Sequence, residues 1–432
     1  MRALWRLEPP RCTTLSPKIN MRILWLGHNL AYPPKGGPLQ RNYNLLKEAA
    51  KSHEVHALLF DQPASRPASV SPEDCVNALL KFCASVDWVS LPKDPLGVGR
   101  YWRAGMAMLT GEPYEFRWLR SREMVSRLRC LVDRLHFDVV HADTLGLAPY
   151  VSLVPGAGTV LNHHDIESVL VQRRASSEPG LLWRKFWSLE AAHLLDAERR
   201  WCPLFDVNTV VSDDEGLLLQ PLCGKSKICV VPNGVDVDYF TPRPDPGGTR
   251  LLFCGRLDQL ADRGAITYFF DSIWPELSAK MKSIEIDVVG KNPPAWLSEL
   301  SQRDSRVHVP GFVDDVRPYF QKATVFVCPI MDGGGTRLKI LDALAMGMPV
   351  VSTTFAASGL ALQHGKHLLM ADTTETFVAS TLRLLSDVVL RQNLAREGLD
   401  RVMQMYSWET IGDSLVHAYE NAASRNNGLF SY

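Results

Sequence analysis

The chain has 432 residues, of which 46% are apolar and 22% charged, a balance typical of globular proteins with large buried cores. Its 47 basic and 47 acidic residues give a formal net charge of zero, which argues against a nucleic-acid-binding protein that relies on overall positive charge. No run approaches 18 consecutive apolar residues and no C-x-x-C pair occurs, so we expect no membrane-spanning helix, no zinc site and a reducing, cytoplasmic location.

Residues 1–20 lack the apolar stretch of a signal peptide and show no periodicity, so we predict a disordered tail or a misassigned translation start. From Met21 onward, short β-branched runs alternate with longer helical patterns. The first half has predicted strands at 22–27, 54–60, 138–142, 159–164, 207–212 and 228–231, and the second half at 250–255, 284–290, 306–309, 324–329, 349–353 and 367–370.

Strands this apolar, alternating with helices, predict an α/β fold with parallel sheets covered on both faces. Residues 241–249 are rich in proline and glycine and are predicted to link two Rossmann-like domains, 21–240 and 250–405. We expect residues 406–432 to form a C-terminal helix that crosses back to the first domain. Two such sheets facing each other would enclose a cleft at the carboxyl ends of their strands.

A glycine-rich turn in the second half is the strongest candidate for a binding site. Gly333, Gly334 and Gly335 follow a predicted strand, and a helix is expected from about Thr336. Backbone N–H groups at such a helix start suit a phosphate, and Lys339 and Asp342 would share one face of the helix. The alternative is a tight turn with a solvated Lys/Asp pair.

A second candidate is Arg256, which ends the buried strand 250–255 beside a glycine, with Arg263 following in the next helix. An arginine at a strand end points into the ligand crevice of an α/β sheet. The alternative is a surface salt bridge with Asp258 or Asp262.

Two features of the first half could face the cleft. Gly36 and Gly37 follow the first strand and permit close backbone approach to a ligand, although a plain Pro/Gly loop is as good an interpretation. The strand 159–164 leads into His163 and His164, which point to opposite faces, so one could face the cleft with Asp165 orienting it. His141 is a weaker candidate of the same kind.

Several stretches of the second half resemble the retaining GT-B enzymes of glycosyltransferase family 4. They are VVPNGVDVDYF (230–240), LLFCGRLD (251–258), VHVPGFVDDVRPYF (307–320), GGGTRLKILDALAMGMPVVST (333–353) and YSWETI (406–411). The GGGTRLKIL variant is most similar to the sugar transferases associated with exosortase/PEP-CTERM exopolysaccharide clusters. The resemblance implies a GT-B fold, a nucleotide-diphosphate sugar donor on the C-terminal domain and a glycan or lipid-linked acceptor on the N-terminal one.

The resemblance also implies roles for individual residues. Catalytic contacts fall to Arg256, at the donor diphosphate, and His164, near the reacting sugar, while Gly36 and Gly37 match the acceptor-side loop. Donor contacts fall to Arg263, Gly334, Gly335, Thr336, Arg337, Lys339 and Asp342. The family's E-x7-E acids correspond to Gly334 and Asp342, so the first acid is missing here and the second is one methylene shorter.

We therefore predict a metal-independent, retaining glycosyltransferase that needs no cofactor, makes polysaccharide and binds no nucleic acid. Two alternatives remain: a catalytically silent nucleotide-sugar-binding subunit, favoured by the missing acid, and a nucleotide-sugar epimerase on the same fold. Peripheral contact with the inner face of the plasma membrane is a further prediction. It rests on residues 117–135, which hold six arginines against two acids with apolar residues interleaved; a helix packed on the sheet is the alternative.

Overall fold

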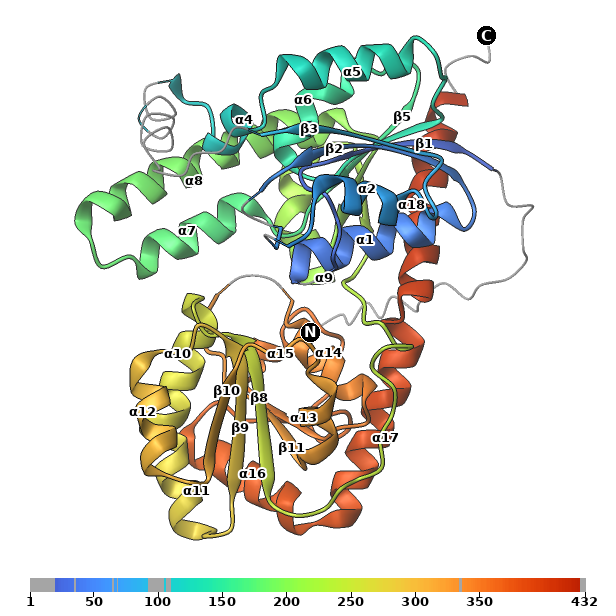
Figure 1. Cartoon of the computed structure of the whole chain (residues 1–432). Coiled ribbons are helices and arrows are strands. Elements are labelled where there is room, and N and C mark those ends of the chain that lie inside the picture. Colours follow the sequence, from blue (N-terminus) through green and yellow to red (C-terminus); the bar gives the residue numbers. More distant parts are fainter. Residues whose placement is uncertain are drawn as a thin grey trace, which may run out of the picture.

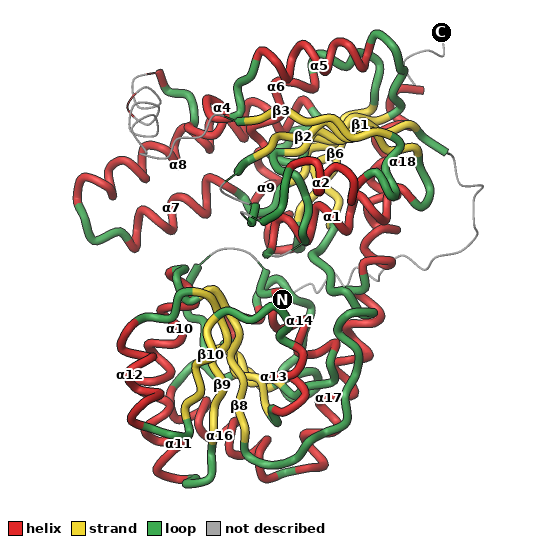
Figure 2. Tube along the Cα trace, viewed as in Figure 1, coloured by secondary structure: helices red, strands yellow, loops and turns green. Residues whose placement is uncertain are grey.

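The computed structural model describes residues 20–34, 36–63, 66–67, 69–91, 105, 110–333 and 336–427. They form two α/β domains, each built on its own parallel sheet (Figures 1 and 2). The predicted fold class is confirmed.

The N-terminal sheet has seven strands in the order β3-β2-β1-β4-β5-β6-β7, and every neighbouring pair is parallel. The strand order reverses between β1 and β4, which is where ligands bind in open α/β sheets. The strands are β1 Arg22–Gly27, β2 Glu54–Asp61, β3 Ser85–Ser90, β4 Val139–Ala142, β5 Gly158–Asn162, β6 Val207–Val210 and β7 Lys227–Val230.

The C-terminal sheet has six parallel strands in the order β10-β9-β8-β11-β12-β13, with its reversal between β8 and β11. They are β8 Arg250–Arg256, β9 Glu285–Lys291, β10 Val307–Gly311, β11 Val325–Cys328, β12 Val350–Ser352 and β13 Leu369–Met370. The twelve predicted strands all appear within a few residues of these bounds. The sequence reading missed β3, because this edge strand is only partly buried and lacks the apolar run that marks the others.

Helices cover both faces of each sheet (Figure 1). Those of the first domain are α1 Gly37–Ala50, α2 Pro72–Leu79, α4 Tyr114–Trp118, α5 Arg122–Val132, α6 Ala148–Val151, α7 Glu167–Ser177, α8 Leu181–Trp201 and α9 Asp213–Leu219. Those that follow β8 are α10 Leu260–Tyr268, α11 Trp274–Lys280, α12 Ala295–Arg303, α13 Arg317–Lys322, α14 Leu338–Ala345, α15 Thr354–Ala357, α16 Thr374–Ser386, α17 Val388–Met405 and α18 Trp408–Asn427. None of the helices in the described ranges combines the length and apolarity needed to cross a membrane.

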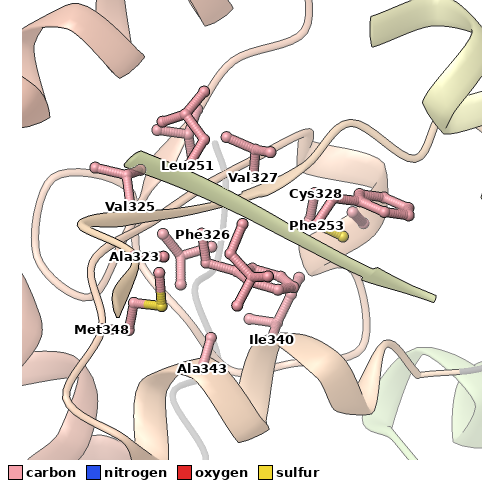
Figure 3. Packing of buried hydrophobic residues seen from close by; sticks show 14 of the residues in the cluster. Leu251, Phe253, Ala323, Val325, Phe326, Val327, Cys328, Ile340, Ala343 and Met348 are labelled. Atoms are coloured by element: carbon pink, nitrogen blue, oxygen red, sulfur yellow. The ribbon is translucent and has the colours of Figure 1, made fainter. Parts of the chain in front are cut away.

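The core of the second domain forms where β8, β11 and α14 meet. Phe253, Phe326 and Ile340, one from each element, are fully buried and lie in one cluster (Figure 3). Because β8 is buried on both faces through Leu251, Leu252 and Phe253, its position is fixed up to the point where Arg256 leaves the sheet.

The C-terminal helix α18 belongs to the core of the N-terminal domain. Its apolar side chains, Trp408, Ile411, Leu415, Ala418, Tyr419 and Ala422, join the cluster formed by β1 and α1. At Gly158 of β5 a Cβ atom would lie 2.6 Å from the backbone of Ala422, so only glycine permits this close approach. Residues 241–249 have no helix or strand and connect the two sheets.

Candidate functional site

Three side chains meet at the carboxyl ends of β1, β4 and β5. His28 follows β1, Asp143 follows β4 and His164 lies two residues after β5. The Nδ1 atom of His28 lies 2.6 Å from Oδ2 of Asp143, and Nε2 of His164 lies 3.0 Å from Oδ1 of the same carboxylate. One buried acid therefore orients two half-buried histidines.

Electrostatics strengthens this cluster. Burial alone would raise the pKa of Asp143, but the adjacent His164 and His28 hold it well below its usual value. Burial lowers the pKa of His28, yet the charge of Asp143 and its hydrogen bond raise that pKa above the ordinary value overall. The amide of Asn42, on α1, donates to Oδ2 at 2.6 Å and helps to satisfy the carboxylate. The buried carboxylate of Asp143 thus favours the protonated form of His28.

Sequence reasoning pointed to His164 and proposed Asp165 as its partner. The structure places the carboxylate of Asp143 against the ring, because β4 and β5 are neighbours in the sheet and their ends lie side by side. His163 points the other way into the core, where its Nε2 lies 3.0 Å from Oδ1 of Asn208 and burial lowers its pKa to about 4. His141 is a core residue stacked on Trp25, with ring centroids 3.8 Å apart. Asp143 and His28 were missed.

The loop before α1 is shaped by glycine. Gly36 has a φ of 100°, which favours glycine, and a Cβ at Gly36 or Gly37 would meet no atom within 4 Å. Behind this loop, the buried Arg41 donates to the carbonyl oxygens of Val231 and Pro232, each at 2.8 Å. Arg41 thereby ties α1 to the segment that leaves the first domain, a role that the sequence did not suggest.

At the carboxyl end of β8 the side chain of Arg256 is 59% exposed, and its Nε lies 3.6 Å from Oδ1 of Asp258. The backbone N–H of Arg256 donates to Oδ2 of Asp262 at 2.6 Å. Arg263, in α10, has a weak bond of 3.4 Å to the carbonyl oxygen of Leu257. The salt bridge with Asp258 is long and exposed, so it leaves the guanidinium of Arg256 open to a ligand.

Lys339 pairs with Asp262, and it does not act as part of a solvated pair with Asp342. A Cβ at Gly255 would lie 2.5 Å from Oδ2 of Asp262 and 2.9 Å from Nζ of Lys339, so glycine makes room for this ion pair. The pair joins α14 to α10 directly beneath Arg256. Its first effect is to fix the two helices against the end of β8.

The segment between β11 and α14 differs from the expectation. The helix begins at Leu338 with Arg337 as its N-cap residue, not at Thr336, and no side chain caps it. The backbone bends here because Leu338 N–H donates to the carbonyl oxygen of Thr336 at 3.1 Å. Arg337 is 8% exposed and its guanidinium lies 5.6 Å from the ring centroid of Phe355. Gly334 and Gly335 lie outside the described residues.

Asp342 is the most unusual ionisable group of this domain. It lies on α14, its Oδ1 atom is buried without a hydrogen-bond partner, and burial raises its pKa to about 7. A buried acceptor left unpaired is costly, so such an atom marks a place where a ligand hydroxyl could bind.

The carboxyl ends of the two sheets face each other. A Cβ at Gly359 would lie 3.6 Å from Oγ of Ser212, in the first domain, and 3.9 Å from Oγ1 of Thr336. The carboxylate of Asp165, beyond β5, also acts to raise the pKa of Arg337, although burial lowers that pKa overall. The histidine cluster and the Arg256–Asp342 region therefore lie on facing edges of the two domains.

A cavity of about 760 Å³ opens beside the histidine cluster in the first domain. His28 and His164 line its inner end together with Glu115 and Thr144, and most of the other lining residues come from α7 and α8. As a set of ligands, His28, Asp143 and His164 could also hold a metal ion, since one donor atom of each lies within 4.8 Å of the others. In the described part of the chain no other such group occurs.

Two family descriptions match the chain. "Glycosyltransferase Family 4" matches residues 35–239 and "Glycosyl transferases group 1" matches residues 248–387, one for each domain. The chain carries both domains of a family 4 glycosyltransferase. The glycosyltransferase assignment and the GT-B fold predicted from the sequence are confirmed.

The chain is similar to several characterised glycosyltransferases. The phosphatidyl-myo-inositol mannosyltransferase of Mycobacterium leprae is 26% identical over 45% of the chain and 54% of the relative. The lipopolysaccharide core biosynthesis glycosyltransferase LpsE of Rhizobium meliloti is 33% identical over 26% of the chain and 33% of the relative. Among solved structures, Anabaena HepE in complex with UDP-glucose covers 94% of the chain at 14% identity, with a TM-score of 0.59 and 100% of its own length covered.

The chain spans about half the length of the mannosyltransferase that it matches, 54%. At 14% identity the likeness to HepE shows the fold and no more. Donor, acceptor and stereochemistry therefore do not follow from these matches alone.

Proposed function

We propose that this glycosyltransferase moves a sugar from a nucleotide-diphosphate sugar to a glycan or lipid-linked acceptor, with retention of configuration, in the synthesis of a cell-surface polysaccharide. The observation that carries the proposal is that the carboxyl ends of the two sheets face each other and present different side chains. One presents two histidines held by a buried acid, and the other presents an exposed arginine at the end of β8 and, on α14, a buried carboxylate oxygen without a hydrogen-bond partner.

The donor fits the C-terminal edge by its chemistry. Its diphosphate carries negative charge, which the guanidinium groups of Arg256 and Arg263 attract. The ribose hydroxyls are hydrogen-bond donors, and Asp342 offers them an acceptor that has no protein partner. The transferred sugar would then extend toward His164.

The reaction breaks the bond between the anomeric carbon and the phosphate oxygen. Negative charge grows on the departing diphosphate, and Arg256 and Arg263 stabilise it most in the transition state. The acceptor hydroxyl forms the new bond on the same face, and its proton passes to the departing phosphate oxygen. Among the described residues we find no well-placed acid that could form a covalent intermediate with the sugar. We therefore prefer this front-face route, which the resemblance to the family also implies.

A transferase of exopolysaccharide synthesis, of the kind found with exosortase/PEP-CTERM clusters, is the biological role we propose. The support is the GGGTRLKIL sequence and the similarity to LpsE, a lipopolysaccharide core enzyme. The missing acid at Gly334 keeps a silent binding subunit as the second candidate, and an epimerase as the third.

A panel of nucleotide sugars tests the proposal. The true donor at about 100 times its Kd should stabilise the protein by about 2.7 kcal/mol in a thermal-shift assay. The same donor should release nucleoside diphosphate slowly, and NMR of the glycosylated product should show the donor's anomeric configuration. Stabilisation without release supports the silent subunit, and a new nucleotide sugar formed without acceptor supports the epimerase.

A further inference from the structure

A helical hairpin projects from the first domain and ends in exposed apolar residues. The helices α7 and α8 lie side by side and extend beyond the sheet to their common turn (Figure 1). The first three residues after the turn, Leu181, Leu182 and Trp183, are 74%, 80% and 44% exposed. Consecutive large apolar side chains with this exposure are costly in water, so they indicate a surface that contacts something else.

Basic side chains lie close to this apolar tip. Arg184 and Lys185 follow Trp183 directly, Arg173 and Arg174 lie further back in α7, and all four are exposed. Between residues 172 and 185 Glu178 is the lone acid against these four bases. Exposed leucine and tryptophan flanked by arginine and lysine is the composition that enters the interface of an anionic bilayer.

The predicted membrane segment at 117–135 lacks this combination. It forms the end of α4 and α5, and Trp118, Val125 and Leu131 pack against the core, as in the alternative interpretation. Arg127 is engaged by Glu123 and Asp87. The apolar side chains of that segment are therefore partly buried, whereas Leu181 and Leu182 at the hairpin tip are largely exposed.

The hairpin tip is continuous with the cavity beside His164. Side chains on one face of each helix line this cavity: Glu167, Leu170, Val171 and Arg174 from α7, and Trp183, Phe186, Trp187, Glu190 and Leu194 from α8. Their spacing of three and four residues keeps them on one stripe of each helix. From Trp183 to Leu194 the groove runs about 17 Å along α8, at about 1.5 Å per residue.

The two ends of the groove differ in chemistry. The outer part presents the aromatic rings of Trp183, Phe186 and Trp187, which suit the apolar faces of sugar rings. The guanidinium of Arg174 stacks on one face of Trp187, 3.7 Å from the ring centroid. The inner part presents Glu115, Thr144 and Glu167 next to the histidines. The hydroxyl of Thr144 lies 2.8 Å from a carboxyl oxygen of Glu115 and 3.0 Å from one of Glu167.

The threonine hydroxyl has a single hydrogen, so both contacts are hydrogen bonds only if one carboxyl keeps its proton. Burial, and then the neighbouring Glu115, raise the pKa of Glu167 well above its usual range. The aromatic rings and clustered carboxyl groups of this groove suit the hydroxyls and apolar faces of the glycan part of an acceptor.

We propose that the α7–α8 hairpin captures a membrane-bound acceptor: its tip enters the surface of an anionic bilayer, and its groove leads the glycan of a lipid-linked acceptor to His164. This rests on the proposed function, since it gives that reaction its acceptor class. The lipid stays in the bilayer, the phosphate link lies among the basic residues at the tip, and the sugars follow the groove inward.

Vesicle flotation of the full chain tests the tip. Wild-type protein should float with phosphatidylcholine vesicles containing phosphatidylglycerol, less at high salt, and not with phosphatidylcholine alone. The Leu181→Gln/Leu182→Gln variant should lose at least about tenfold in affinity for the vesicles, because burying even one leucine side chain changes the binding constant by about that factor. The Val388→Gln/Val389→Gln variant changes two exposed apolar residues at the start of α17 and should float like wild type. Wild-type protein that does not float, or equal loss in both variants, would overturn the inference.

Transfer to membranes tests the groove. With UDP-glucose, or whichever donor of the panel the protein turns over, and a membrane fraction of the source organism, label should enter the lipid extract. Trp187→Ala should lose about tenfold or more of this label, with recovery in Trp187→Phe. If wild-type protein releases diphosphate but labels no lipid, or if Trp187→Ala labels lipid normally, the acceptor assignment is wrong. If the wild-type protein neither binds nor cleaves any donor, the proposed function itself is wrong.

Discussion

Donor binding should depend on pH through Asp342, and the structure sets the size of the effect. Burial raises the pKa of this carboxyl to about 7, and its Oδ1 atom has no partner in the protein. Ribose hydroxyls donate hydrogen bonds best to the ionised form, so protonation of Asp342 should weaken binding. Because the folded-state pKa lies above the ordinary value, affinity should rise as pH increases through 7.

The magnitude follows from the ionised fraction. With a pKa of about 7, about one carboxyl in eleven is ionised near pH 6 and about ten in eleven near pH 8, which predicts a tenfold lower Kd at the higher pH. Asp342→Asn should bind more weakly and lose this slope, because the amide does not titrate. The same substitution should raise Tm at about pH 8, where the wild-type protein buries a charge that the variant lacks.

Isothermal titration calorimetry at about pH 6, 7 and 8 measures both slopes. An intact nucleotide sugar is the right ligand, since it has no terminal phosphate that titrates in this range. Glu215, whose pKa burial also raises to about 7, is present in both proteins and cancels in the comparison. Equal pH slopes in wild type and Asp342→Asn would refute the assignment of this carboxylate to the donor.

Three further predictions concern the rest of the chain. Asp143→Asn should slow turnover and move the pH profile lower, because His28 loses the charge that raises its pKa; its loss of Tm should be larger at about pH 5.5 than at about pH 9, since the ion pair stabilises the fold only while His28 is protonated. An unchanged pH profile would exclude a role in proton handling. Transfer should continue in EDTA, because Asp143 holds both histidines in place without a metal ion. Activity that disappears in EDTA and returns with manganese would instead assign a metal to His28, Asp143 and His164. A chain that begins at Met21 should keep Tm and turnover, and insoluble expression of that chain would contradict the prediction for residues 1–20.

The strands were predictable because most are buried on both faces and read as apolar runs; β3, half-buried at the sheet edge, was not. Arg256 and His164 could be placed at the sheet edge from the sequence, because Arg256 ends the apolar strand β8 and His164 lies just after the apolar strand β5. Asp143 was missed because its partners are 115 and 21 residues away, and only the neighbouring places of β1, β4 and β5 in the sheet bring them together.

The start of α14 shows a second limit of the sequence. Glycine-rich turns do not specify where the following helix begins. The helix was expected from about Thr336, but it begins at Leu338 with Arg337 as its N-cap residue. The partner of Lys339 could not be predicted either, because Asp262 lies on another helix and is 77 residues away. Local spacing favoured Asp342, but the packing of α10 against the end of β8 decides the pairing.

Turnover and melting temperature of Arg256→Ala, measured on one sample with the true donor, test the central claim most directly. Arg256 should stabilise the departing diphosphate, so turnover should fall by on the order of 100- to 1,000-fold while Tm stays unchanged, and Arg256→Lys should recover only part of the loss. Arg303→Ala, which removes an arginine that is 79% exposed on α12, should retain full turnover. Turnover of Arg256→Ala equal to that of wild type would contradict the assignment of this strand end to the leaving group, and with it the proposed donor site.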